Sequence, residues 1–340
     1  MKKILLLITI PYWLFSQEVT TEFLNYDGLE RSYILYIPES YSENNPTPLV
    51  LNLHGYSSNA GQQMIYSEFY SIADSEGFIL IHPEGTTDPN GFQFWNSENL
   101  FPIDDVGFLS ALIDQIVLEY NINTNRVYSM GMSNGGFMSY KLACELSDKI
   151  AAIASVTGSM STNQITLCNP NSPTPVMQIH GTSDPTVLYD GSLGIASIEN
   201  VISFWININN CNLSPIINSI PDLNLTDLSN AEHYIYSNGI NESSVELYKI
   251  INGGHTWPGA SIPLVGNNTN QDLNASEKIW DFFNKYDLSG LVENNSNIEE
   301  KINDKNILKC IDLFGRNSNR KNIYIEIYND GSVHKKYLIK

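Results

Sequence analysis

The sequence predicts an α/β fold in which helices cover both faces of a mostly parallel β-sheet. Short apolar runs typical of strands recur along the chain, and patterns typical of helices separate several of them. In residues 106–120, for example, apolar side chains recur at the spacing of one helix face. Strands are expected near residues 49–53, 78–81, 126–130, 150–156, 176–179 and 245–250.

The two ends of this region carry local signals of their own. Residues 20–25 and 31–36 alternate in polarity around Asp27-Gly28, which predicts an opening β-hairpin. Near the other end, residues 274–277 read Asn-Ala-Ser-Glu, a capping box that predicts a helix over 279–283. Residues 212–230 are rich in Asn and Ser, so we expect a loop-rich insertion there.

A strand–turn–helix pattern places one serine where hydrolases carry their nucleophile. Residues 131–135 read Gly-Met-Ser-Asn-Gly, after an apolar run at 126–130 and before a helical pattern at 136–143. Small neighbours permit the strained turn that lifts a serine hydroxyl clear of the sheet. The start of the following helix favours the negative charge that develops nearby. We therefore predict Ser133 as the nucleophile of an ester or amide hydrolase, against the alternative of a structural turn serine.

Two downstream residues fit the partners of such a serine, in the order Ser, Asp, His. Asp184 follows the strand-like run at 175–181, and His255 lies in a glycine-rich loop after the run at 245–250. Asp190 is the main alternative to Asp184, although its neighbouring glycine indicates a second turn. We predict Asp184 and His255 as the other two members of a catalytic triad.

The five other histidines have different surroundings. Three precede a glycine or proline at an expected strand end, and we interpret them as residues that shape the site from beneath: His54, His82 and His180. Two lie outside such loops: His233 and His334.

An acyl-transfer site also needs two N–H donors for the oxyanion. One is expected from the backbone of Asn134, which follows the nucleophile. The other should come from a loop after an earlier strand, and residues 48–57 supply an apolar run followed by His54-Gly55. We nominate the backbone N–H of Tyr56, with a simple strand-ending turn as the alternative.

At this point the chain resembles the polyhydroxybutyrate-depolymerase-like esterases, an α/β-hydrolase family that includes feruloyl and acetylxylan esterases. Five blocks carry the resemblance in one order: residues 53–55, 104–108, 131–136, 180–185 and 253–259. It runs from about residue 23 to 286 and implies an α/β-hydrolase fold with Ser133, Asp184 and His255 as the triad. It leaves the substrate open, because such a family places several ester classes on one scaffold.

The expected function is a secreted serine carboxylic-ester hydrolase that forms an acyl-enzyme on feruloyl or acetyl esters of plant polysaccharide. Poly(3-hydroxybutyrate), or its oligomers, is the main alternative substrate. A serine peptidase or an acyltransferase would share the triad, and a non-catalytic adhesion module is the least favoured class. Trp95 and Trp257 lie near the site in sequence, so we expect them either to stack on a substrate ring or to belong to the core.

Composition excludes several partners. The net charge of −19 and the pI near 4.5 argue against binding to nucleic acid or to acidic membranes. No Cys/His spacing resembles a zinc site, and neither a P-loop nor a dinucleotide fingerprint occurs, so no metal or cofactor is expected.

The start of the chain predicts export. Lys2-Lys3 precede a short apolar stretch at residues 4–10, which is typical of a secretory signal peptide, here residues 1–16. The stretch is too short for a transmembrane anchor, so an extracellular or outer-surface location is expected. Export makes the four cysteines candidates for disulfides, and three complete pairings are open: the residues are Cys144, Cys168, Cys211 and Cys310.

The C-terminal end differs in kind from the rest. We predict a catalytic domain over residues 17–287, a polar linker over 288–304 and a β-rich segment over 305–340. The last segment resembles the C-terminal sorting segments of the type IX secretion system of Bacteroidetes, which implies secretion machinery as a partner. The alternative is a small β appendage that packs on the enzyme or on a surface.

Overall fold

The chain divides into two units, Met1–Glu293 and Asn294–Lys340. The computed structural model describes residues 18–262 and 267–289, together with three C-terminal strands at 307–311, 323–328 and 333–337. The expected signal peptide, residues 1–16, and most of the expected linker, 288–304, lie outside the described residues.

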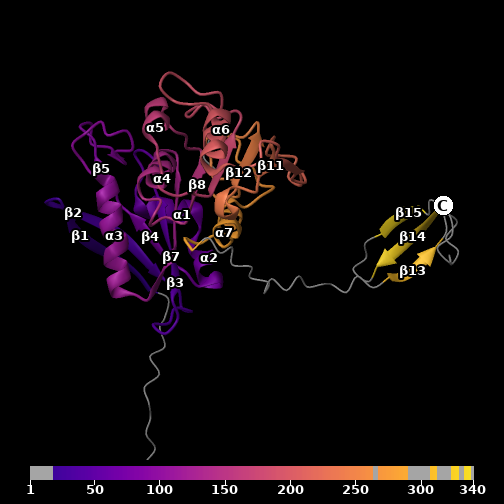
Figure 1. Ribbon diagram of the computed structural model, residues 1–340, viewed down its shortest axis with the longest axis horizontal. Coiled ribbons are helices and arrows are strands. Elements are labelled where there is room, and N and C mark those ends of the chain that lie inside the picture. The colour runs from indigo at the N-terminus through magenta and orange to yellow at the C-terminus, as the bar shows by residue number, and fades with distance from the viewer. Residues whose placement is uncertain (1–17, 263–266, 290–306, 312–322, 329–332, 338–340) are drawn as a thin grey trace, which may run out of the picture. The chain divides into compact units, whose positions relative to one another are not determined.

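A ten-stranded sheet forms the centre of the larger unit (Figure 1). Its six central strands are parallel, and its outer strands are antiparallel. In spatial order the strands are β1 (Glu18–Tyr26), β2 (Leu29–Ile37), β4 (Ile79–Pro83), β3 (Thr47–Leu53), β7 (Ile122–Met132), β8 (Ala152–Val156), β9 (Val176–Gly181), β12 (Val245–Ile251), β11 (Asn230–Tyr236) and β10 (Ile216–Ser219). The expected mostly parallel sheet is confirmed.

Helices cover both faces of this sheet because consecutive strand residues point to opposite sides. Leu49 and Leu51 pack in one core with α3, α4 and α6, whereas Val50 packs in a second core with α2 and α7. Each face therefore has its own apolar layer. The helices are α1 (Ala60–Ser67), α2 (Tyr70–Glu76), α3 (Asp105–Glu119), α4 (Asn134–Glu145), α5 (Thr162–Leu167), α6 (Ile198–Asn209) and α7 (Ala275–Phe283).

Two local predictions are confirmed. β1 and β2 pair up to Tyr26 and Leu29, so Asp27 and Gly28 make a two-residue turn with φ of 48° and 78°. At the start of α7, the Asn274 side chain accepts hydrogen bonds from two backbone N–H groups, which caps the helix.

The prediction for residues 212–230 was partly wrong. This stretch contains the edge strand β10, which pairs with β11. All four side chains of β10 are exposed, so the strand lacks the apolar alternation by which sequence patterns are recognised.

One disulfide joins two of the cysteines, and a third is free. Cys144 at the end of α4 is bonded to Cys168 just after α5. Cys211 is buried and free, and its thiol donates to the backbone oxygen of Ser243 at 3.6 Å. The side chain of Cys310 lies outside the described residues.

The smaller unit holds an antiparallel sheet in the order β13 (Ile307–Ile311), β14 (Ile323–Tyr328) and β15 (Val333–Tyr337). These three strands lie within residues 305–340, which were predicted to be rich in β-structure. Across the part of the chain that the structure describes, no helix is both long and apolar enough to cross a membrane.

Candidate active site

Ser133 lies on a sharp turn between β7 and α4. Its backbone has φ 52° and ψ −118°, and its N–H donates to the Val156 oxygen at 2.8 Å. The two glycines of the pentapeptide are needed for close packing. A Cβ on Gly135 would lie 2.2 Å from the Leu53 oxygen, and one on Gly131 would lie 2.5 Å from the Gly135 carbonyl carbon. The strained turn therefore exists because its neighbours have no side chains.

Asp184, which is buried, and His255, which is partly buried, form a pair at the same edge of the sheet. Asp184 follows β9, His255 follows β12, and the His255 Nδ1 atom lies 2.7 Å from the Asp184 Oδ2 atom. The other oxygen of Asp184 accepts the backbone N–H groups of Thr186 and Val187 at 2.8 and 2.9 Å. The carboxylate is thus held in place by the turn that carries it.

His180 is a second partner of this carboxylate. Its Nε2 atom lies 3.4 Å from Asp184 Oδ2 and 2.8 Å from the Val187 oxygen, and its other ring nitrogen contacts Gln178. Burial by itself would raise the pKa of Asp184, but hydrogen bonds with His180 and His255 hold that pKa well below its ordinary value. Asp184 is therefore charged and able to stabilise a protonated His255.

A pocket of about 510 Å³ brings the nucleophile and the histidine together, since Ser133 and His255 both line it. Within the described residues no hydrogen bond joins these two side chains; in enzymes this contact often tightens only when substrate is bound. Apolar and aromatic side chains form much of the wall: Tyr56, Ile65, Tyr66, Met132 and Ile262. The sequence did not single out the isoleucines, because neither lies in a motif.

The two nominated oxyanion donors lie beside this pocket. Asn134 is the first residue of α4, and the first N–H groups of a helix have no acceptor within it. Tyr56 follows β3 and lines the pocket. β3 and β7 are neighbouring parallel strands, so the loops that carry these two N–H groups begin at the same edge of the sheet.

Trp95 does not line the pocket, and its side chain is only 1% exposed. Its backbone N–H and oxygen are both hydrogen-bonded to the Asn134 side chain, at 2.6 and 3.0 Å, and its indole N–H donates to the His54 oxygen at 3.1 Å. The expectation of a stacking contact with substrate is therefore corrected. Trp95 supports the loops of the site from behind.

Trp257 needs the same correction. It is 1% exposed, its indole N–H donates to the Ser276 hydroxyl at 3.0 Å, and its backbone N–H donates to the Tyr66 hydroxyl at 3.0 Å. These contacts bury its ring between the His255 loop and α7. The sequence shows that a tryptophan is near the site but not which way it points.

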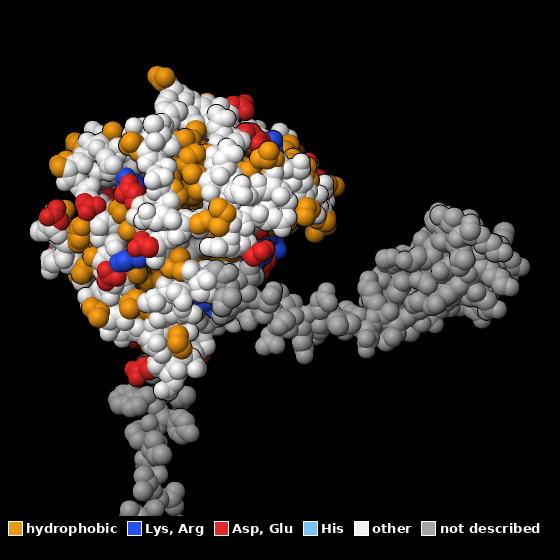
Figure 2. Space-filling view, viewed as in Figure 1, with side chains coloured by type: hydrophobic (Ala, Val, Ile, Leu, Met, Phe, Trp, Pro, Cys, Tyr) orange, Lys and Arg blue, Asp and Glu red, His pale blue; other side chains and the backbone are white. Residues whose placement is uncertain are grey.

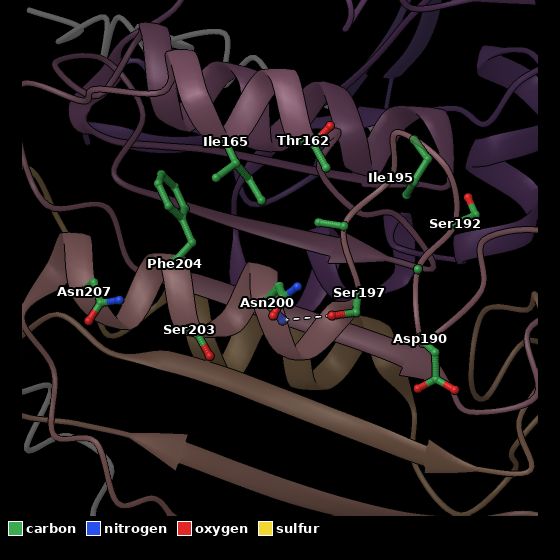
Figure 3. A pocket seen from close by; sticks show the side chains of 12 residues that line it. Thr162, Ile165, Asp190, Ser192, Ile195, Ser197, Asn200, Ser203, Phe204 and Asn207 are labelled. Atoms are coloured by element: carbon green, nitrogen blue, oxygen red, sulfur yellow. Dashed lines mark hydrogen bonds between the residues drawn. The ribbon is translucent and has the colours of Figure 1, made fainter.

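Asp190, the alternative acid, lies elsewhere. It lines a separate open hollow of about 700 Å³ between α5 and α6. Figure 3 shows Ile165 of α5 and Phe204 of α6 extending toward each other across it, and Figure 2 shows apolar side chains gathered in this region. Neither Ser133 nor His255 lines this hollow, so Asp190 is not part of the arrangement around the serine.

Two of the other histidines hold loops of the site. The His54 ring contacts the Gly55 oxygen at 2.8 Å and accepts the Gly85 N–H at 2.9 Å, and His180 contacts Asp184 as described. His233 of β11 instead pairs with Glu246 of β12, at 2.7 Å. In residues 18–262 and 267–289, no group of three or more His, Cys, Asp or Glu side chains is arranged to hold a metal ion.

Comparison with known proteins identifies the family of this chain. Residues 31–229 match the family model described as esterase PHB depolymerase. The chain is 27% identical over 272 residues to a bifunctional acetylxylan esterase/xylanase of Neocallimastix patriciarum, covering 79% of this chain and 35% of that protein. It is 30% identical over 237 residues to feruloyl esterase B of Piromyces equi, covering 66% of this chain and 42% of that protein. The chain thus spans less than half of the length of these two relatives.

One solved structure matches the fold over most of its length. The acetyl xylan esterase from Aspergillus awamori superposes with a TM-score of 0.57 at 14% identity, covering 79% of this chain and 99% of that one. At such low identity the likeness concerns the fold alone. Together with the sheet order and the turn at Ser133, it confirms the expected α/β-hydrolase fold.

Proposed function

The chain belongs to the esterase PHB depolymerase family, and from that premise we propose that it is a secreted serine esterase that acts on feruloyl esters of plant polysaccharide. One observation carries the proposal. Ser133 and His255 line the same largely apolar pocket, and the Asp184 Oδ2 atom lies 2.7 Å from the His255 Nδ1 atom. That is the arrangement required of a nucleophile, a general base and an orienting acid.

The proposed reaction is a two-step acyl transfer. His255 accepts the proton of the Ser133 hydroxyl as its oxygen attacks the ester carbonyl, and Asp184 stabilises the resulting imidazolium. The backbone N–H groups of Tyr56 and Asn134 hold the oxyanion. The proton then passes from His255 to the departing alcohol, which leaves an acyl-enzyme. A water molecule, activated by His255 in turn, attacks the acyl-enzyme and releases the acid.

The pocket favours an aromatic acyl group over an acetyl group. An acetyl group would fill only a small part of its volume of about 510 Å³, and the remainder would stay walled by apolar side chains such as Ile65 and Met132. A feruloyl ring buries far more apolar surface against such a wall. The names of two relatives, an acetylxylan esterase/xylanase and a feruloyl esterase, support a plant-polysaccharide ester.

The proposed route out of the cell has two parts. Residues 1–16 act as the secretory signal peptide, and the segment at 305–340 acts as a sorting segment for secretion machinery. The three-stranded sheet at β13, β14 and β15 supports a small folded unit of the kind such a role requires. After deletion of residues 305–340, we expect no mature protein in the culture medium. The full-length chain, as the control, should be exported normally.

The deciding experiment is hydrolysis of methyl ferulate by protein that lacks residues 1–16, with Ser133→Ala as the control. Release of ferulate that depends on Ser133 is the expected result. If the serine reacts with a fluorophosphonate but no ferulate is released, the feruloyl assignment is wrong. Acetylated xylan and 3-hydroxybutyrate oligomers are then the substrates to compare.

A further inference from the structure

Two aromatic rings are exposed side by side at the mouth of the pocket. Tyr56 and Phe92 are each 48% exposed, and their ring centroids lie 5.7 Å apart. The rings belong to different segments, the loop after β3 and the turn between β5 (Thr86–Thr87) and β6 (Gln93–Phe94). We call this pair, Tyr56 and Phe92, the aromatic platform.

The platform is held in place by a network centred on Asp88. The Tyr56 hydroxyl donates to Asp88 Oδ2 at 2.8 Å, and Asp88 Oδ1 accepts the backbone N–H groups of Asn90 and Phe92 at 2.8 and 3.0 Å. The two segments are also joined by a backbone hydrogen bond, from the Ser57 N–H to the Gln93 oxygen at 2.8 Å. A surface ring held in this way loses little conformational entropy when a ligand stacks on it.

The position of the platform relates it to one part of an ester substrate. Tyr56 lines the pocket together with Ser133 and His255, whereas Phe92 does not line it. The platform therefore begins at the pocket wall and continues outward. When the acyl group fills the pocket and the carbonyl lies at Ser133, the alcohol part of the ester lies at the mouth.

We propose that the aromatic platform binds a glycosyl unit of the alcohol part, so that Phe92 sets the preference for oligosaccharide esters over small esters. This inference rests on the proposed function and identifies where the leaving group binds. A sugar ring has an apolar C–H face that stacks on an aromatic plane, with hydroxyls around its edge. Polar side chains that could meet those hydroxyls line the same pocket as Tyr56: Ser57, Ser58 and Gln62. A polyester chain has no hydroxyls along its length for them.

The experiment compares Phe92→Ala with Phe23→Ala, a matched truncation of a phenylalanine that is 60% exposed on the edge strand β1. For each variant, kcat/KM is measured on methyl ferulate and on a feruloylated xylo-oligosaccharide. In Phe92→Ala the ratio of the second value to the first should fall about tenfold, mostly through KM. In Phe23→Ala the ratio should stay at the wild-type value. The variant Phe92→Tyr keeps an aromatic plane, so its ratio should also stay near the wild-type value. An equal ratio in Phe92→Ala and the wild type would overturn the proposal.

A binding measurement separates this inference from the proposed function. Unesterified xylo-oligosaccharide is titrated into Ser133→Ala, with and without Phe92→Ala, and the Kd is read by calorimetry. Weaker binding with Phe92→Ala supports the platform even if the wild type releases no ferulate. Equal binding overturns it. If Phe92→Ala instead weakens hydrolysis of a 3-hydroxybutyrate trimer and leaves oligosaccharide binding unchanged, the platform serves a polyester and the saccharide assignment is wrong.

Discussion

The side-chain amide of Asn134 hydrogen-bonds to both backbone groups of Trp95, a residue 39 positions earlier in the chain. The Trp95 N–H donates to Asn134 Oδ1 at 2.6 Å, and Asn134 Nδ2 donates to the Trp95 oxygen at 3.0 Å. The indole of Trp95 in turn donates to the oxygen of His54, two residues before Tyr56. One buried tryptophan is thus connected to both segments that carry the proposed oxyanion donors.

We expect Asn134→Ala to lower kcat about 10- to 100-fold while leaving KM for methyl ferulate within about threefold. The backbone N–H of residue 134 remains, but its position is no longer fixed by Trp95, and small misplacements of such groups are costly. The variant should also lose about 1–3 kcal/mol of unfolding free energy, because the buried N–H and oxygen of Trp95 lose their partner. Steady-state kinetics and urea denaturation measure the two effects.

Asn209→Ala is the matched control for this experiment. Asn209 is buried and contacts both backbone groups of Thr174 in the same way, at 3.1 and 2.8 Å, at the end of α6. A similar loss of stability with wild-type kcat is expected. If both variants lose kcat equally, the effect of Asn134 is one of general stability and not of the oxyanion site.

Asp184→Asn should reduce kcat by about 10⁴-fold with little change in KM, because an amide no longer holds the correct tautomer of His255 or stabilises its cation. Asp190→Asn, the same change in the alternative acid, should retain near wild-type kcat, since Asp190 lines the separate hollow. The kcat of each variant on methyl ferulate decides which of the two aspartates acts with His255. Activity lost in Asp190→Asn and kept in Asp184→Asn would reverse the assignment.

Because His82 is buried, we expect the protein to lose stability in mild acid. Its ring is fully buried on β4 without a hydrogen-bond partner among the described residues, and burial lowers its pKa from the ordinary 6.5 to about 3. Below pH 6.5 the His82 ring therefore binds a proton in the unfolded chain, whereas in the folded protein it stays neutral until the pH is near 3. Stability from this group is fully present above pH 6.5 and is lost as the pH falls toward 3.

The unfolding free energy of the wild type should fall by about 1 kcal/mol per pH unit between about pH 6 and 4.5 from this residue alone. His82→Leu lacks the titrating ring. Its unfolding free energy, measured by denaturant titration at each pH, should therefore fall by about 1 kcal/mol less per pH unit than that of the wild type. Parallel curves for the two proteins would contradict the prediction.

Loss of the Cys144–Cys168 disulfide should destabilise the larger unit. The bond closes a loop with a sequence separation of 24, for which the restriction of the unfolded chain contributes about 2–4 kcal/mol. The double variant Cys144→Ser/Cys168→Ser should therefore melt at a lower temperature than the wild type. A reductant should lower the melting temperature of the wild type toward that of the variant and leave the variant itself unaffected.

Much of the fold, and the placement of Ser133, Asp184 and His255 at one edge of the sheet, could be predicted because they depend on local patterns. The Asp27-Gly28 turn, the Asn274 cap and the Gly-x-Ser-x-Gly turn at Ser133 each need residues within a few positions of one another. Parallel strands then carry their C-terminal loops to one edge without further information.

The remaining features could not be predicted because they depend on contacts between distant segments. The contact between Asn134 and Trp95 joins a helix start to a loop that has no regular pattern. The direction of the Trp95 and Trp257 rings, toward the core, follows from packing that a motif does not encode. The edge strand β10 was missed since both of its faces are exposed.

The Asp88-centred turn has a consequence for how substrate range can change. It carries Phe92 on a stretch between β4 and α3, whereas Ser133, Asp184 and His255 follow β7, β9 and β12. Insertions, deletions or grafted sequences in that one turn change the proposed platform at Phe92, while Ser133, Asp184 and His255 keep the strands that carry them. Exchange of residues 88–92 between homologues would therefore replace Phe92 and its Asp88 support, while the strands β7, β9 and β12 stay as they are.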